Sequence, residues 1–474
     1  MTANSPGLSL AGTPAASPLG YYSWTFGQCA RDPYYIMIVI YIFMPYFSNV
    51  VVGDPVRGQS LIGYVTATVG VILALTAPFL GAIADKNGRR KPWVATTVVL
   101  IAMGSLGLWM VYPDQSGLGI WSTFVLLVVI KVAFTTSEVF HNAMLPSVAP
   151  VEKVGTVSGI AFAIGNVGGL LCMLFVLFAF SLPGTQEWSF LPDAPLWGID
   201  QSSHEHDRIV GPLAAVWILL FSLPVLLFTP DGPKSSAPIW ASAKQGVKDV
   251  LATFRQLKHY SNIAIYLLAR MFFIDGMVGV MTFGGVYASG TFGWDTTALL
   301  IFGLCTSASA MFGAYLGGLL DDWLGSIGTL KVAIGVSSAM LLMLVSVTPH
   351  SVLYGLVELG DEAVWAFPYF SSAPEIVYLL TNQIFAMFFV TGLSSSRTMM
   401  ARISPPSMVT QFFGLFALSG TVTAFLAPLL VATMTDWFDS QRVGFASLAV
   451  LMVIGFGLLF WVREEQSTQA PDSA

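Results

Sequence analysis

The sequence predicts an all-α polytopic membrane protein. It should have twelve transmembrane helices in two pseudo-symmetric six-helix bundles, with both termini in the cytoplasm. Three observations support this fold class: the composition, a series of long apolar segments, and a one-sided distribution of Lys and Arg. The chain is 55% hydrophobic and 10% charged, with a mean hydropathy of +0.74. A soluble domain carries about 25% charged residues, so no soluble core needs to be invoked.

Twelve segments are apolar and about as long as a membrane-spanning helix, which needs roughly 20 residues. They cover residues 30–52, 60–84, 93–112, 119–141, 156–181, 211–229, 261–289, 296–320, 329–348, 376–400, 411–434 and 443–462. Their Gly and Pro content is normal for membrane helices, which pack through small residues.

The orientation follows from the basic residues. With the N-terminus inside, 15 of the 20 Lys and Arg residues are cytoplasmic or lie at the cytoplasmic interface. Only Arg57, Arg208 and Arg442 fall outside, and Lys131 and Arg270 are left within the membrane. Basic residues are retained on the cytoplasmic side, so this asymmetry predicts that both termini are cytoplasmic.

The domain organisation follows from composition. Residues 1–20 are uncharged and rich in Ser, Pro, Gly and Ala, which predicts a disordered tail rather than a cleaved signal peptide. The first bundle should cover 21–229 and the second 261–463, before a polar tail at 464–474. Between the bundles, the basic linker 230–260 should be cytoplasmic, with an amphipathic helix at 240–258 lying on the membrane surface.

The two halves resemble each other in sequence. Paired residues recur at two fixed offsets, as expected for a parallel repeat of six helices. At an offset of 255 the pairs are Met144/Met399, Pro150/Pro405, Gly159/Gly414 and Gly165/Gly420, and at 236 they are Gly81/Gly317 and Asp85/Asp321.

The most specific motif is the loop from Gly81 to Lys91, with the pattern G-x-x-x-D-x-x-G-R-R-K between two apolar segments. It resembles the signature loop between helices 2 and 3 of the major facilitator superfamily. The resemblance implies the major facilitator fold, and it implies conformational roles for Asp85, Gly88, Arg89 and Arg90. Asp85 can cap a helix end or pair with an arginine, and the glycines permit a sharp turn. The alternative is a generic basic cytoplasmic loop.

Three further stretches resemble the vacuole-effluxer branch of that superfamily, which contains vacuolar amino-acid exporters and bacterial relatives. They are Trp24 with the run 30–35, the run 141–146, and the helix 10–11 junction at 394–402 and 412–420. Through the junction, the resemblance adds Arg397 and Arg402 to the conformational residues. The chain departs from the branch pattern at Gln28, Arg31, Gln411 and Thr421. These departures leave the solute and the coupling ion open.

Ionisable residues within the membrane are the candidates for binding a solute or an ion, because burying each costs roughly 2.5–3.5 kcal/mol on insertion scales. On helix 4, Lys131 and Glu138 are two turns apart and share a face, and His141 is one turn beyond Glu138. Such a face suits a charged or zwitterionic solute, and Glu138 could instead hold a proton. A structural ion pair is the alternative for Lys131 and Glu138, and a simple interfacial position is the favoured one for His141.

Arg270 and Asp275 lie on helix 7 about 140° apart, so they need not pair. Asp275 is also a candidate proton carrier, because Asp275-Gly276 matches an Asp-Gly pair typical of the resembled branch. Arg31 and Asp32 precede Pro33, which suits the first turn of a helix, where they would gate or cap its cytoplasmic end. A second group could supply neutral hydrogen bonds to a solute or between helices: Tyr34, Asn142, Asn166, Asn382 and Gln383.

Cofactors and metals are not expected. Cys29, Cys172 and Cys305 are far apart, and no nucleotide-binding loop is present. The outer loop 182–210 contains two histidines among carboxylates, which could bind a metal but more often form a solvated loop.

The sequence therefore predicts a secondary active transporter rather than an enzyme. It should move a small polar organic solute, such as an amino acid, by alternating access coupled to protons. Its expected partners are that solute, the coupling ion and the lipid bilayer, without nucleic acid and as a monomer. In a bacterium it would lie in the inner membrane. The alternatives are a transport-inactive receptor or scaffold, and a uniporter of sugars or organic acids.

Overall fold

A computed structural model describes most of the chain and divides it into two compact units. The described residues are 8–9, 13–86, 89–150, 153–186, 188–232, 260–360, 362–404, 412, 415–416, 419–420 and 423–464, with only the backbone described at 77–86 and 155. Unit 1 comprises Met1–Val52 and Leu75–Asp249, and unit 2 comprises Gly53–Ala74 and Val250–Ala474. The linker helix expected at 240–258 lies outside the described residues.

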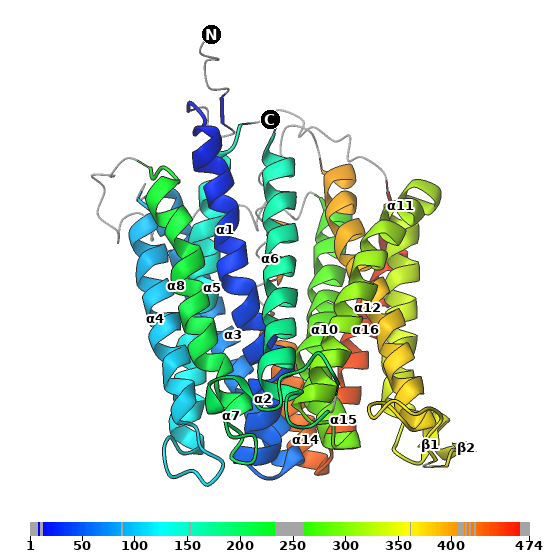
Figure 1. Cartoon of the computed structure of the whole chain (residues 1–474). Coiled ribbons are helices and arrows are strands. Elements are labelled where there is room, and N and C mark those ends of the chain that lie inside the picture. The colour runs from blue at the N-terminus through cyan, green and yellow to red at the C-terminus, as the bar shows by residue number, and fades with distance from the viewer. Residues whose placement is uncertain are drawn as a thin grey trace. The chain divides into compact units, whose positions relative to one another are not determined.

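Unit 1 is a bundle of long helices. In it α1 packs against α6 and α8, and α4 packs against α5 and α8 (Figure 1). The elements are α1 (Pro18–Tyr34), η1 (Tyr35–Tyr41), α2 (Phe43–Tyr46), η2 (Phe47–Val51), α3 (Pro55–Lys86, shared with unit 2), α4 (Lys91–Gly107), η3 (Leu108–Met110), α5 (Ile120–Val148), α6 (Val154–Val176), η5 (Leu177–Ser181), η6 (Leu196–Gly198), α7 (Glu205–Arg208) and α8 (Val210–Phe228).

Unit 2 is also helical and carries a two-stranded hairpin. The helix α10 packs against α16, and α11 packs against α12. The elements are α10 (Ser261–Phe292), α11 (Thr296–Ser346), β1 (Ser351–Val352), η8 (Leu353–Gly355), β2 (Val357–Glu358), α12 (Ala373–Ile403), α14 (Leu426–Phe438), α15 (Gln441–Ala446), α16 (Leu448–Leu458) and η9 (Leu459–Trp461).

The predicted apolar segments all fall on helices, in whole or in part. Among the described residues, 10 helices are long and apolar enough to cross a membrane. The 51-residue α11 merges two predicted segments. As one helix it would be about 75 Å long, far beyond a bilayer core of about 30 Å. The chain breaks it at Gly325, whose φ of 72° lies in the left-handed region that glycine favours.

The first helix begins earlier than the sequence predicts. It starts at Pro18, within the segment assigned to the tail, because the Ser17 hydroxyl accepts a hydrogen bond from the Gly20 amide and proline suits the first helical position. Pro33 is consequently inside α1 rather than at its start. The expectation that Arg31 and Asp32 cap the helix start is therefore wrong, since both lie in its last turn.

The first part of α3 makes its contacts within unit 2. The Gln59 amide donates to the Thr435 hydroxyl (2.8 Å) and to the Gln441 carbonyl (3.0 Å). The Tyr64 hydroxyl donates to Asp436 (2.6 Å). A Cβ on Gly63 would lie 2.7 Å from that of Ala432, so glycine permits the close approach of α3 to α14.

Candidate functional site

A buried polar cluster lies where α1 meets α5 and α6 in unit 1. We call Gln28, Arg31, Asp32, Glu138 and His141 the Arg31 cluster. The Arg31 side chain, 2% exposed, donates to the Gln28 carbonyl oxygen (3.1 Å), and the Gln28 amide donates to Asp32 (2.6 Å). The Glu138 carboxylate interacts electrostatically with both Arg31 and Asp32. One buried guanidinium thus lies within electrostatic range of two carboxylates, an arrangement that is costly inside a membrane.

His141 is completely buried and joins this cluster to Trp24. Arg31 can only donate, so its 3.0 Å contact with His141 Nδ1 makes that nitrogen the acceptor. The other nitrogen, Nε2, therefore carries the proton and donates to the Trp24 carbonyl at 2.8 Å. The Trp24 indole stacks on the imidazole with ring centroids 4.4 Å apart and donates to the His141 carbonyl. The expectation of an interfacial position for His141 is wrong.

Two glycines allow this packing. A Cβ on Gly27 would lie 2.2 Å from His141 Nε2, and one on Gly165 of α6 would lie 2.1 Å from an Asp32 oxygen. Real Cβ contacts are not this short, so only glycine fits either position without a shift of its neighbours. Gly165 is also one of the residues repeated in the second half, at Gly420.

The other candidates of unit 1 are spread along α1 and α5. Lys131 is buried on α5, and Asn142 is exposed near its end. Tyr34 is 1% exposed and lies beside Phe134 in a tilted arrangement, with ring centroids 5.2 Å apart. Its hydroxyl has no hydrogen-bond partner among the described residues, so it could still form a hydrogen bond with a ligand.

In unit 2, no hydrogen bond or ion pair joins Arg270 to Asp275 among the described residues. The Arg270 guanidinium lies 3.6 Å from the Phe416 ring centroid and donates to the Ser396 and Ser419 hydroxyls. Asp275, 8% exposed, accepts a hydrogen bond from the Ala427 amide (3.2 Å). Ala427 is in the first turn of α14, so the carboxylate sits at the positive end of that helix.

The neutral candidates of unit 2 lie on α12. The Asn382 amide donates to the Thr306 hydroxyl of α11 (2.9 Å), which is an interhelical contact. Both polar atoms of the Gln383 amide are buried without a partner among the described residues. Gln383 is therefore the stronger candidate for a solute contact.

The same helix-capping device occurs in both units. In unit 1, the Asp231 carboxylate accepts from the Arg90 and Lys91 amides at the start of α4 (2.8 and 3.3 Å). In unit 2, the Glu464 carboxylate accepts from the Ser326 and Ile327 amides just after the break in α11 (3.2 and 3.0 Å). The two amide pairs are related by the repeat offset of 236.

The arginines beside these caps act differently. Arg402 bonds both Glu464 and Asp321, with its contact to Asp321 at 3.2 Å. We call Asp321, Arg402 and Glu464 the Arg402 network. In unit 1, Arg90 instead donates to the Ser147 hydroxyl (3.2 Å), which is the repeat partner of Arg402 at an offset of 255. Arg89 and Arg397 are exposed. Gly88 and the Asp85 side chain lie outside the described residues.

The pKa of Glu464 reflects its partners. Burial alone would raise it, but the Ile327 amide, the Arg402 guanidinium and the Ser326 amide outweigh that effect and hold the pKa below its ordinary value. Composition places Glu464 in the polar tail and Asp231 in the linker, so neither was a candidate. The signal that could have found them is a carboxylate three residues beyond the last helix of each half.

Comparisons with known proteins agree with this architecture. The model of the family described as vacuole effluxer Atg22-like matches residues 149–471, and that of the major facilitator superfamily matches 24–199. An uncharacterised MFS-type transporter, YxiO of Bacillus subtilis, is 23% identical over 94% of this chain and 95% of its own length. Autophagy-related protein 22 of Yarrowia lipolytica is 21% identical over 71% of this chain, which spans 55% of that longer protein.

Solved structures show the same fold. The D-xylose-proton symporter matches with a TM-score of 0.63 at 14% identity, over 94% of this chain and 97% of its own. The nucleoside transporter NupG matches with a TM-score of 0.61 at 13% identity, over 94% and 98%. The predicted all-α membrane fold of the major facilitator type is confirmed, while the count of twelve helices and the cytoplasmic position of both termini stay predictions.

Proposed function

The chain belongs to the vacuole effluxer Atg22-like family of major facilitator transporters, and from this premise we propose that it moves a small polar organic solute by alternating access coupled to protons. Membrane transport itself follows from the fold and the relatives. The single observation that carries the proposal is the Arg31 cluster, which holds a buried guanidinium, two carboxylates and an imidazole within membrane-spanning helices.

The chemistry of the cluster favours a solute with a carboxylate and an amine. Arg31 offers a cation to a carboxylate, and Asp32 and Glu138 offer anions to an amine. An amino acid or a similar zwitterion combines both groups. Tyr34, with its unpartnered hydroxyl on the next turn of α1, supplies a neutral hydrogen bond.

Protonation of Asp275 could change the position of α14, because the carboxylate caps that helix. Its ionised carboxylate stabilises the N-terminus of α14 by charge and by the Ala427 hydrogen bond. Protonation removes the negative charge of Asp275 and weakens this cap. If the carboxylate has its hydrogen-bond partner in only one conformation of the transport cycle, its ionised form favours that conformation. Glu138 is the second candidate for proton coupling, because its carboxylate interacts electrostatically with the buried Arg31 of unit 1. On this proposal the Arg402 network stabilises one conformation of the cycle.

The experiment is solute flux in proteoliposomes with and without a pH gradient. A thermal-shift screen over amino acids, sugars and organic acids first selects the solute, because a ligand of the native state raises its stability. We expect uptake above the equilibrium level only with the gradient. Flux that equilibrates without responding to the gradient would support a uniporter, and absence of flux across the panel would support a receptor or scaffold.

Two variants test the coupling. Glu138→Gln and Asp275→Asn should each abolish concentration of the solute while exchange persists, and Asn at 275 keeps an oxygen that can accept from Ala427. Glu362→Gln, at an exposed carboxylate, is the control. If both variants still concentrate solute with the wild-type pH dependence, these carboxylates are structural.

The Bacillus subtilis relative favours the bacterial inner membrane as the location, whereas the Atg22 relatives favour a vacuolar one.

A further inference from the structure

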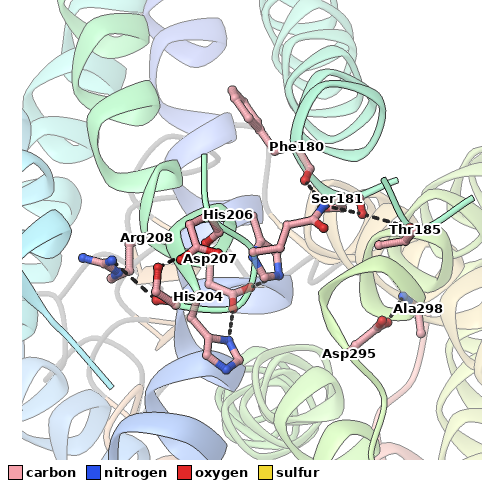
Figure 2. A network of polar contacts seen from close by, with 12 residues as sticks. Phe180, Ser181, Thr185, His204, His206, Asp207, Arg208, Asp295 and Ala298 are labelled. Atoms are coloured by element: carbon pink, nitrogen blue, oxygen red, sulfur yellow. Dashed lines mark hydrogen bonds and ion pairs between the residues drawn. The ribbon is translucent and has the colours of Figure 1, made fainter. Parts of the chain in front are cut away.

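Two histidines and a buried carboxylate converge in the loop between η5 and α8 of unit 1. We call His204, His206 and Asp207 the histidine cluster. The His204 Nδ1 lies 2.8 Å from Asp207 Oδ2, and the His206 Nε2 lies 3.6 Å from Asp207 Oδ1 (Figure 2). One nitrogen from each ring and a carboxylate oxygen all lie within 4.8 Å of one another. The expectation of a solvated loop does not describe this part of it.

The local backbone holds the three side chains together. His204 adopts a left-handed conformation (φ 58°) just before the single turn of α7. Upstream, the Gln201 amide donates to the Phe180, Ser181 and Pro183 carbonyls, which fastens the loop to η5. The cluster is therefore placed by the loop's own bonding, before any ligand arrives.

Burial and charge favour a cation at this site. The Asp207 side chain is only 4% exposed, and those of His204 and His206 are 37% and 16% exposed. The neighbouring Arg208 is engaged by the Trp109 and Tyr112 rings (4.8 and 4.6 Å), the Trp109 carbonyl and the Glu205 carboxylate (3.8 Å).

Hydrogen bonding does not fully account for the His206 ring. Its Nδ1 is buried and has no hydrogen-bond partner among the described residues. A buried polar atom without a partner costs free energy, and the ring is held here by the contact of its other nitrogen, Nε2, with Asp207 and by stacking on the His204 ring (centroids 5.9 Å apart).

We propose that the histidine cluster binds one divalent transition-metal ion of the Zn²⁺ class. Two imidazoles and a carboxylate are donors that Zn²⁺, Cu²⁺ and Ni²⁺ prefer, whereas Mg²⁺ and Ca²⁺ prefer oxygen donors alone. In a tetrahedral site with bonds of about 2.0–2.2 Å, the donors lie about 3.3–3.5 Å apart. His204 Nδ1 lies 2.8 Å from one Asp207 oxygen and His206 Nε2 lies 3.6 Å from the other, so both nitrogens are near that range from the carboxylate. Water would complete the coordination, and the ion would brace the loop against the start of α8.

The test uses the full chain in detergent, with any affinity tag removed because polyhistidine itself binds Zn²⁺. After treatment with EDTA and removal of the chelator, Zn²⁺ is titrated by calorimetry, and thermal unfolding is measured with Zn²⁺, with Mg²⁺ and without metal. We expect one saturable Zn²⁺ site per chain and a rise in the unfolding temperature that Mg²⁺ does not reproduce. Absence of saturable Zn²⁺ binding would overturn the proposal.

Variants locate the site. His204→Gln should weaken Zn²⁺ binding at least tenfold, and it should fold because that side chain is partly exposed. His206→Gln should act in the same way. The matched control is His350→Gln, at an exposed histidine of unit 2, which should keep the wild-type affinity. If His204→Gln lowers the unfolding temperature equally with Zn²⁺ and with EDTA and leaves the affinity for Zn²⁺ unchanged, the cluster only stabilises the loop through its His–Asp hydrogen bond.

Discussion

At the scale of single residues, the Arg31 cluster gives a physical account of where this chain departs from its branch. Gln28 and Arg31 replace an acid and an amide of the resembled pattern, and they contact each other directly. The guanidinium of Arg31 then reaches His141 on α5. The two departures from the resembled pattern are therefore joined in one hydrogen-bond network of this chain.

The contact between Gly27 and His141 leads to a stability prediction. Gly27→Ala should lower the free energy of unfolding by about 1–3 kcal/mol, because the added methyl overpacks against the imidazole. It should also weaken the His141–Trp24 hydrogen bond. The measurement is thermal unfolding of the purified protein.

The control is Gly159→Ala on α6, where a Cβ would meet nothing within 4 Å. This change should be neutral or stabilising by up to about 1 kcal/mol, since alanine favours helix. Equal unfolding temperatures for the two variants would contradict the role of Gly27.

At the scale of elements, the break in α11 depends on two residues far apart in sequence. Gly325 provides the backbone conformation, and a Cβ there would lie 2.8 Å from a Glu464 oxygen. Glu464 in turn satisfies the amides of Ser326 and Ile327, which have no acceptor within their own helix. The corresponding helix start in unit 1 uses Asp231. In both units, a carboxylate three residues beyond the last helical element caps the start of the third predicted helix.

This cap should make stability depend on pH. The folded-state pKa of Glu464 is lowered, so its contribution is present above the ordinary value of 4.5 and is lost as the pH falls through the folded-state pKa. Glu464→Gln should therefore cost about 1 kcal/mol at neutral pH, as loss of a helix cap does. The difference from wild type should shrink below pH 4.5.

Thermal unfolding between pH 7 and pH 3.5 measures this effect, with Glu358→Gln on the exposed β2 strand as the control. A wild-type difference that stays constant over that pH range would show that Glu464 acts by packing alone.

At the scale of the whole molecule, the twelve-helix topology remains a prediction with a direct test. In a background without Cys29, Cys172 and Cys305, a cysteine at Ser203 should react with an impermeant maleimide in intact cells. A cysteine at Ser235 should react only after permeabilisation, because the basic linker is expected in the cytoplasm. Equal labelling of both in intact cells would break the assignment of sides. Residue 203 adjoins the histidine cluster, so labelling is done without added metal.

The sequence by itself determined the fold class and the positions of the apolar helices. Hydropathy and charge are properties of local composition, and a bilayer selects for them segment by segment. The repeat offsets of 255 and 236 were also readable, because the equivalent residues keep their spacing in both halves. The structure shows one such equivalence at the offset of 236, because the backbone amides of Arg90 and Ser326 each donate to a capping carboxylate.

Only the tertiary structure decided which candidate residues meet. His141 and Arg31 are 110 residues apart, and the distance between them depends on how α1 packs against α5. The same holds for the 138 residues between Ser326 and Glu464. Which side chains meet across two helices depends on how each helix is rotated about its axis and on where a glycine lets the two backbones approach closely. The periodicity of one helix contains no information about the helix that packs against it. The histidine cluster lies close together in sequence, yet its burial came from the loop's attachment to η5, which composition does not encode.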